Sequence, residues 1–226
     1  PEEGIFVDPS EREGLPEVVD DFDLDFNAGS DEWLRHVANE ANLRDFTERT
    51  AVHLMNEPRE GFPLLVLDLD HTLLDFSSRR LRNAGSFQEG EAQSARMKRP
   101  FMDEFLAAVH RRYDLVVWSQ TSWRWLETKL IELGMLAHPR YGFCFVLDKT
   151  SMFKITSTRR GGERVEHSVK PLQLVWSKFP GRWGSHNTVH LDDLARNFAL
   201  NLGCGLKCTA YHRKRRGAKK DVELLA

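Results

Sequence analysis

A short apolar run that ends in carboxylates constrains this chain more than any other feature. Leu64–Leu67 is apolar throughout and leads into Asp68, Asp70 and Thr72. The run is too short for a helix, so it predicts a strand that is buried on both faces. Residues two apart in an extended chain project to the same side, which places the two carboxylates close together. A hard cation with oxygen ligands, such as Mg²⁺, would relieve their repulsion. Turn formation after a strand explains these residue types equally well.

The same pattern, an apolar segment followed by polar side chains, recurs along the chain. Ser119 follows one such segment, and Asp192 and Asp193 follow another. Parallel strands need long connections, and ligands collect beyond their carboxyl ends, so we expect an α/β fold with a parallel sheet that gathers these side chains. The further strands are expected at Asp114–Trp118, 143–148 and 188–191, and the helices between them at 100–109, 123–133 and 172–176.

The remaining segments carry weaker signals. Lys170 lies just after a strand-like segment, which is the only local hint that it is more than a surface charge. The loop at 76–99 is rich in arginine, Arg99 included, and suits either substrate contacts or a solvated surface. We also expect a helix that begins at Ser30, a weak strand at 50–55, a hairpin within 151–168 and a helical segment at 194–200.

Charge and composition narrow the function classes. The net charge of −2 hides an acidic start, because residues 1–25 hold ten acidic side chains and one arginine. We expect a solvated linker at 1–29, with docking onto a basic surface as the alternative. The basic cluster at 212–220 suits a solvated helix face, a nuclear address or a patch that attracts phosphate. No apolar run is long enough for a membrane span, and the three cysteines predict neither a disulfide framework nor a zinc site.

Four motifs, taken in order, carry a resemblance to a known family. The stretch from Asp68 to Thr72, then Ser119, Lys170 and the Asp192-Asp193 pair resemble the motifs of the haloacid dehalogenase-like superfamily. The stretches VVWSQT, VKPLQLVW and LDDLARNF resemble its FCP/SCP-type protein phosphatases. The resemblance implies a three-layer αβα sandwich over 30–226, with a loop insertion at 76–99, a small β insertion within about 143–168 and no large cap domain. It also implies a Mg²⁺-dependent protein serine/threonine phosphatase that acts through an aspartyl-phosphate.

The resemblance also assigns roles to residues. Asp68 is expected to attack phosphorus, and Asp70 to protonate the leaving oxygen and then deprotonate water. Thr72 is expected to hold the turn. Magnesium ligands are expected from Asp68, the backbone carbonyl of Asp70 and Asp193, with Asp192 orienting a water or the lysine. Donors to the phosphoryl oxygens and the substrate are expected from Ser119, Lys170 and Arg99.

Partners and a nuclear location, with the cytoplasm as the alternative, follow from the same resemblance. Nuclear phosphoproteins, such as proteasome subunits or the C-terminal domain of RNA polymerase II, are the expected substrates, and neither a membrane nor a nucleic acid is an expected partner. Docking on the 26S proteasome is expected to need a ubiquitin-like domain that has no counterpart in these 226 residues. Two alternatives remain: a binding module that keeps the fold without the chemistry, and a phosphatase of small metabolites. The second class usually needs a large cap domain.

Overall fold

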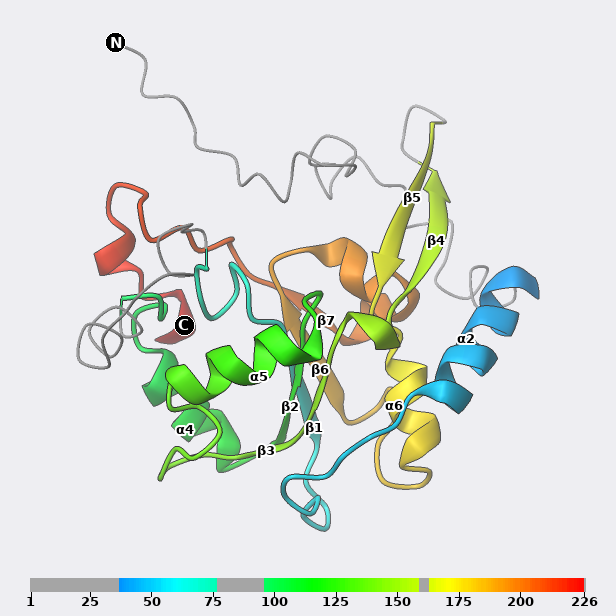
Figure 1. Cartoon of the computed structure of the whole chain (residues 1–226), viewed down its shortest axis with the longest axis horizontal. Coiled ribbons are helices and arrows are strands. Elements are labelled where there is room, and N and C mark those ends of the chain that lie inside the picture. The colour runs from blue at the N-terminus through cyan, green and yellow to red at the C-terminus, as the bar shows by residue number, and fades with distance from the viewer. Residues whose placement is uncertain (1–36, 77–95, 159–162, 226) are drawn as a thin grey trace.

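A five-stranded parallel sheet forms the centre of the molecule (Figure 1). The computed structural model describes residues 37–76, 96–158 and 163–225. The strand order β3-β2-β1-β6-β7 confirms the predicted α/β fold, and all neighbouring strands run parallel. The strands are β1 (Leu64–Leu67), β2 (Asp114–Trp118), β3 (Phe143–Leu147), β6 (Thr188–Asp192) and β7 (Gly205–Lys207).

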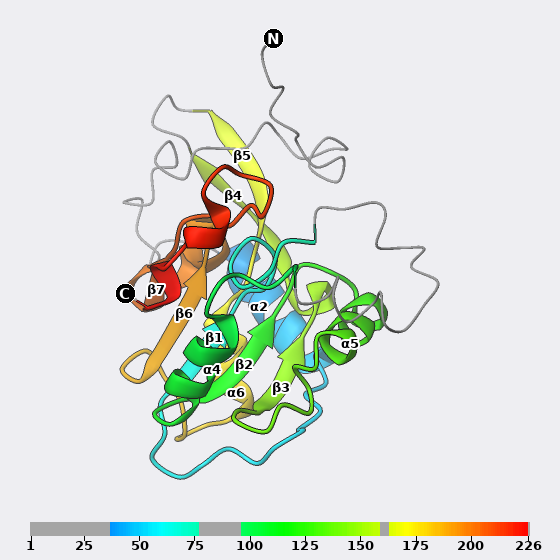
Figure 2. The same ribbon diagram turned by 90° about the vertical axis from the view of Figure 1, so that its left-hand side faces the viewer.

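Helices cover both faces of this sheet, as the predicted sandwich requires (Figure 2). Successive residues of a strand point to opposite faces, so Leu65 joins one core cluster and Val66 the other. The first cluster packs under α4 (Met102–His110) and α5 (Trp123–Glu132), and the second under α6 (Leu172–Lys178) and α2 (Val37–Arg49). Because both faces are covered, the strands can be apolar at almost every position.

The predicted hairpin is present between the sheet and Lys170. Strands β4 (Phe153–Thr158) and β5 (Arg164–Val169) pair antiparallel and project beyond the carboxyl end of the sheet (Figure 1). Lys170 follows β5 directly and precedes α6. The hairpin thus returns the chain to the sheet, and Lys170 lies at the point of return.

Several details differ from the sequence-based expectations. The weak strand predicted at 50–55 is wrong, because this segment forms no ladder and touches β3 through single bonds such as Met55 N to Cys144 O, 2.7 Å. The segment expected to be helical at 194–200 is a kinked 3₁₀ helix, Ala195–Cys204. Strand β7 was not predicted; it begins at Gly205, where a Cβ would lie 2.1 Å from the ring of Phe198.

Some expectations fall outside the described residues. These are the acidic segment at 1–29, the start of the first helix at Ser30 and most of the loop at 76–99. Within the part of the chain that is described, no helix combines the length and apolar character that a bilayer span needs.

Candidate active site

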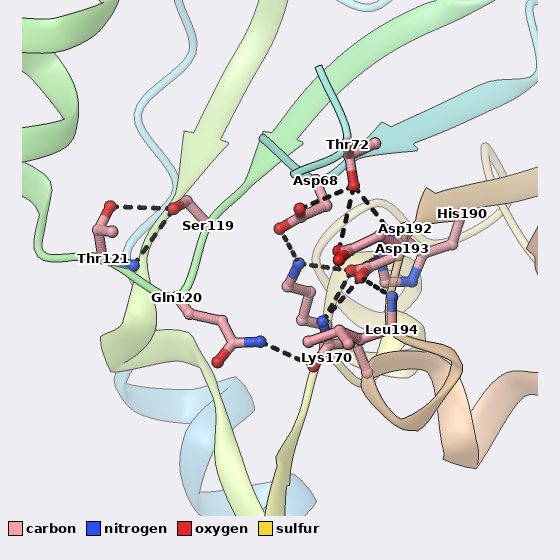
Figure 3. A network of polar contacts seen from close by, with 11 residues as sticks. Asp68, Thr72, Ser119, Gln120, Thr121, Lys170, His190, Asp192, Asp193 and Leu194 are labelled. Atoms are coloured by element: carbon pink, nitrogen blue, oxygen red, sulfur yellow. Dashed lines mark hydrogen bonds and ion pairs between the residues drawn. The ribbon is translucent and has the colours of Figure 1, made fainter. Parts of the chain in front are cut away.

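Buried acidic side chains converge at the carboxyl ends of β1 and β6. The register of these strands pairs Leu67 with Leu191, which brings Asp68 beside Asp192 and Asp193. Ligand oxygens from these three aspartates lie within 4.8 Å of one another, and each residue is at most 7% exposed. Lys170 reaches the same point from the end of the hairpin (Figure 3). The structure thus brings together four of the residues predicted from separate motifs.

Lys170 bridges the two strands through their carboxylates. Its Nζ donates to Asp68 Oδ1 at 2.5 Å and to Asp192 Oδ2 at 2.7 Å, and the side chain is fully buried. Burial opposes the charged ammonium, but Asp192 and Asp68 outweigh this penalty and raise the pKa of Lys170. The lysine is therefore a fixed cation that pulls the nucleophile candidate and the β6 carboxylate toward each other.

Asp192 is held as a fixed anion. Asn197 Nδ2 donates to both of its carboxylate oxygens at 2.9 Å, and the backbone N of Leu194 donates to Oδ1 at 2.9 Å. Burial acts to raise the pKa of Asp192, but Lys170 outweighs it and holds that pKa well below its usual range. His190 Nε2 lies 3.3 Å from Oδ2 without hydrogen-bond geometry. With its oxygens already used, Asp192 is suited to positioning Lys170.

Asp68 and Asp193 have fewer donors and share one hydroxyl. Thr72 Oγ1 lies 3.0 Å from Asp68 Oδ2 and 3.4 Å from Asp193 Oδ1, while it accepts from the backbone N of Asp193 at 3.1 Å. A hydroxyl has one proton, so it can serve only one of these carboxylates at a time. Thr72 thus links the turn after β1 to Asp193, which directly follows β6, and its role in holding the turn stays a prediction.

The charge balance at this cluster fits a bound cation. Burial first, and then the charges of neighbouring aspartates, raise the pKa of Asp68 to about 7 and that of Asp193 to about 8. A single ammonium therefore does not neutralise the three carboxylates. A hard divalent cation with oxygen ligands suits such a site, and Mg²⁺ typically takes one or two carboxylates and keeps several waters. The residues best placed to hold it are Asp68 and Asp193, since Asp192 is saturated.

Without a cation, the folded chain is expected to lose stability as the pH rises from about 4 to about 8. Unfolded carboxyls ionise near pH 4, whereas the pKa values of Asp68 and Asp193 are raised to about 7 and 8 in the folded chain. The folded state binds more protons in this interval, so the stability present below pH 4 is lost as the pH passes through 8.

Thermal melts in a chelator, run at about pH 5.5 and about pH 8.5, test this expectation. The melting temperature should fall by several degrees at the higher pH, and added magnesium should reduce the fall. Asp193→Asn is the matched control, since removing one of the two groups should flatten the profile. A melting temperature that rises with pH in the chelated protein would contradict the charge balance described above.

Ser119 lies on the other side of Asp68 from the β6 carboxylates, at the end of β2 (Figure 3). Its Oγ lies 2.9 Å from Thr121 Oγ1 and accepts from the backbone N of Thr121 at 3.2 Å. The side chain is 2% exposed, so its orientation is set by the protein. A hydroxyl in this position can donate to a phosphoryl oxygen held over Asp68.

Asp70 occupies the loop after β1 and does not belong to the carboxylate cluster. Its side chain is half-buried, and Oδ1 accepts from the backbone N of Phe76 at 3.3 Å. The next residue, His71, has a φ of 62°, in the left-handed region that non-glycine residues rarely adopt. The acid–base role of Asp70, and the metal contact by its carbonyl, stay predictions.

Arg99 lies outside this cluster. Its Nη1 donates to the carbonyl of Thr72 at 3.1 Å, and Nη2 donates to Asp221 at 3.0 Å and to Glu223 at 2.7 Å. The side chain is 1% exposed. Arg99 thus ties the turn at Thr72 to the C-terminal segment. This placement gives no support to a substrate contact by Arg99, which stays a prediction.

Arg99→Met is expected to lower the free energy of unfolding by about 2 kcal/mol, because the Thr72 carbonyl and two carboxylates lose their donor. The KM for an aryl phosphate should change little. Chemical denaturation and steady-state kinetics measure the two effects. Lys98→Met is the control, since Lys98 pairs with Asp103 on partly exposed side chains and should matter by less than about 1 kcal/mol. A normal stability with a strongly raised KM would instead favour the substrate contact.

Asn197 is the functional residue that sequence reasoning missed. The residue falls in the segment expected to be helical at 194–200, and no chemistry is expected of it from the sequence. Its side chain fixes Asp192, its Oδ1 accepts from Gln120 at 3.0 Å, and its carbonyl accepts from the backbone N of Lys170 at 2.7 Å. The only available signal was its place in LDDLARNF, five residues after Asp192.

Comparisons with known proteins find relatives that match most of this chain. Residues 63–226 match the model of a family described as NLI interacting factor-like phosphatase. The chain is 37% identical over 212 residues to "Ubiquitin-like domain-containing CTD phosphatase 1" of Xenopus laevis and 36% identical over 212 residues to that of Homo sapiens, with 92% of this chain covered in each case. It is 35% identical over 224 residues, 99% of this chain, to "Ubiquitin-like domain-containing CTD phosphatase" of Arabidopsis thaliana. The chain spans 60% of the length of each of these relatives.

Proposed function

We propose, because this chain belongs to the NLI interacting factor-like phosphatase family, that it hydrolyses phosphoserine and phosphothreonine esters in proteins with the help of Mg²⁺. The observation that carries the proposal is the buried contact of 2.5 Å between Lys170 Nζ and Asp68 Oδ1 inside a cluster of three carboxylates. An ion pair of this kind costs desolvation energy, and a merely structural site would be as stable with apolar side chains. Its use is to fix a nucleophile and a cation at one point.

Asp68 is the proposed nucleophile. Lys170 donates to one oxygen of the Asp68 carboxylate and Thr72 to the other, which fixes the orientation of the carboxylate at the carboxyl end of β1. An oxygen of this carboxylate forms a bond to phosphorus, while the bond from phosphorus to the seryl or threonyl oxygen breaks. The product is an aspartyl-phosphate, and water then attacks its phosphorus to release inorganic phosphate and restore Asp68.

Asp70 is the proposed acid and base. In the first step its carboxyl group gives a proton to the leaving oxygen, and in the second its carboxylate accepts a proton from the attacking water. Lys170 and the hydroxyl of Ser119 donate to the phosphoryl oxygens as negative charge develops on them. Bound magnesium would supply further positive charge at the transferring phosphoryl group and keep Asp68 and Asp193 ionised.

Asp70→Asn is expected to lower kcat by about 10² to 10⁴-fold and to leave magnesium affinity unchanged. The loss should be larger for a phosphoserine peptide than for an aryl phosphate, because an alkoxide is the poorer leaving group and needs the proton more. Steady-state kinetics on both substrates, with a magnesium titration of each protein, measure these effects. A collapse of magnesium affinity would mean that the Asp70 side chain is a ligand and has been given the wrong role.

The substrate class is tested by comparing rates. We expect the chain to act on phosphoserine and phosphothreonine peptides with a higher kcat/KM than on sugar phosphates, and magnesium chelation to abolish both activities reversibly. A preference for sugar phosphates would favour the metabolite phosphatase. Absence of any turnover with magnesium present would favour the binding module instead.

Three further proposals concern the physiological substrate, the cellular location and docking on the proteasome. The names of the relatives contain the words "CTD phosphatase". That the substrate is the C-terminal domain of RNA polymerase II stays a prediction. A nuclear location is supported by the basic cluster at 213–220, where most side chains are exposed. Docking on the 26S proteasome stays a prediction, since it rests on a ubiquitin-like domain rather than on any described residue. Imaging a fluorescent fusion, with and without the basic residues replaced, tests the location.

A further inference from the structure

Three large apolar side chains that stay exposed gather around one surface cavity. Leu54, Met55 and Trp123 are 42%, 39% and 42% exposed. All three line a cavity of about 890 Å³, which extends from the end of α2 to the carboxyl end of β3 and the start of α5. Grouped apolar side chains at the surface usually mark an interaction site, whereas scattered ones do not. We call this cavity the anchor pocket, and its lining is Phe46, Arg49–Ala51, His53–Met55, Trp123 and Val146–Met152.

The charges around the anchor pocket favour a ligand that has an acidic side chain next to an apolar one. Arg49 and Lys149 are exposed at its wall. Arg49 lies 3.5 Å from the exposed Asp45 and packs on the ring of Phe46, whereas no ion pair of Lys149 occurs within the described ranges. The one carboxylate in the lining, Asp148, is already used, because it accepts from the backbone N of Trp123 at 2.8 Å and of Thr150 at 2.9 Å. A bound segment with an apolar side chain and an acidic one beside it would complement this surface.

The anchor pocket is linked through the backbone to the segment that carries Ser119. The backbone N of Lys149 donates to the carbonyl of Thr121 at 3.1 Å, and the backbone N of Ser119 donates to the carbonyl of Leu147 at 3.0 Å. One wall of the pocket is therefore bonded to the segment that presents the Ser119 hydroxyl. A ligand that extends from Asp68 past Ser119 reaches this wall next.

The strand order sets the distance that such a ligand must cover. Strand β1, which carries Asp68, and strand β3, which ends at the pocket, are separated only by β2. Neighbouring strands lie about 4.8 Å apart, so the two strand ends are about 10 Å apart. An extended peptide covers about 3.3 Å per residue, which corresponds to about three or four residues.

We propose that the anchor pocket binds a large apolar side chain of the substrate protein, about three or four residues from the phosphorylated residue, with an acidic side chain beside it facing Arg49 and Lys149. The inference rests on the proposed function, since it names the substrate segment that the same site takes. The occupant is thus a phosphoprotein segment in extended conformation. A second copy of this chain, or the acidic segment at 1–29, would be a different occupant.

The test measures peptide binding to the full chain with magnesium present. One labelled phosphoserine peptide carries leucines three and four residues to either side, each next to a glutamate, and a second peptide has serines in place of the leucines. Fluorescence anisotropy gives their dissociation constants in the Asp68→Asn background, where turnover does not remove the phosphate. Two further variants are compared: Leu54→Glu in the pocket, and Ile131→Glu as the matched control, because Ile131 is 61% exposed and does not line the pocket.

The expected result is binding of the leucine peptide about tenfold tighter than of the serine peptide, an advantage that Leu54→Glu removes and Ile131→Glu leaves intact. Both variants, made in the chain that keeps Asp68, should turn over an aryl phosphate at the normal rate. Equal binding of the two peptides would overturn the inference, and so would equal losses in the two variants. A dimer seen by sedimentation that Leu54→Glu dissociates, or tighter peptide binding after removal of 1–29, would also overturn it.

Failure of the proposed function gives a separate signal. If the unaltered chain turns over no phosphate ester, the enzymatic proposal fails, whatever the peptides do. If it turns over the aryl phosphate but binds both peptides equally, the phosphatase proposal stands and the anchor pocket proposal fails. The two outcomes come from different measurements on the same protein.

Discussion

Asp68→Asn is expected to lower the turnover of an aryl phosphate by about a thousandfold or more while the protein stays folded. The amide is nearly the same size as the carboxylate and can still accept from Thr72, but its neutral oxygen is a poor nucleophile. Folding should not suffer, because burial and the neighbouring Asp192 already make the charge at Asp68 unfavourable and raise its pKa to about 7. Kinetics and thermal melts of the purified variant measure the two effects.

A buried aspartate at the opposite end of the sheet provides the control for Asp68. Asp114 is 2% exposed and pairs with Arg59 at 2.7 Å. Asp114→Asn should lower the melting temperature and leave the turnover of the folded protein unchanged. The two variants thus separate loss of chemistry from loss of stability. Normal activity in Asp68→Asn would remove the covalent step from the account.

Lys170→Met is expected to abolish turnover and to lower the free energy of unfolding by about 3 kcal/mol or more. The substitution keeps the length of the buried side chain but removes the ammonium that contacts both Asp68 and Asp192. Two carboxylates are then left buried without their cation, and a donor to the phosphoryl group is lost. Denaturant titration and aryl phosphate kinetics test both parts.

The pH of the Lys170→Met experiment is chosen from the pKa values of Asp68 and Asp193, and its control is a lysine in a more exposed ion pair. At about pH 5.5 in a chelator the protonated forms of Asp68 and Asp193 reduce the repulsion, so the variant should be most stable there. Lys129→Met is the control, since the ion pair of Lys129 within the described residues is with the half-exposed Glu132 on α5, and its loss should cost less than about 1 kcal/mol. If Lys170→Met keeps normal turnover, the ion pair has no part in the chemistry.

Short buried strands made most of the fold predictable from the sequence. LLVL and LVVW are apolar, too short for helices and followed by polar groups, so both the strands and the polar residues at their ends could be placed. Strand β7 gave no such signal, because it is three residues long and its strand identity depends on pairing with β6. The strand predicted at 50–55 shows the converse. Apolar and polar residues alternate weakly there, but no described strand pairs with this segment to form a ladder.

The site residues that directly follow an apolar strand segment could be predicted from the sequence. Asp68 and Asp192 follow buried strands, whereas the contact between Lys170 and Asp68 spans 102 positions of sequence and rests on the hairpin that returns the chain. The local signal for this lysine is only its position after a strand-like segment, and the family resemblance assigns its role. Arg99 shows the limit of the approach, because an arginine in a loop beside the site was expected to face substrate. Its partners lie 122 and 124 positions further on, at Asp221 and Glu223.

We propose that Asp68 attacks phosphorus at a magnesium site that Lys170 completes. The most direct measurement is a crystal structure of the chain with magnesium and a fluoride-based phosphoryl analogue. We predict that the analogue is attached to the carboxylate of Asp68, with magnesium bound by Asp68 and Asp193, and with Lys170 and Ser119 donating to the fluorides. An analogue bound away from Asp68, or magnesium held elsewhere in the chain, would contradict the account.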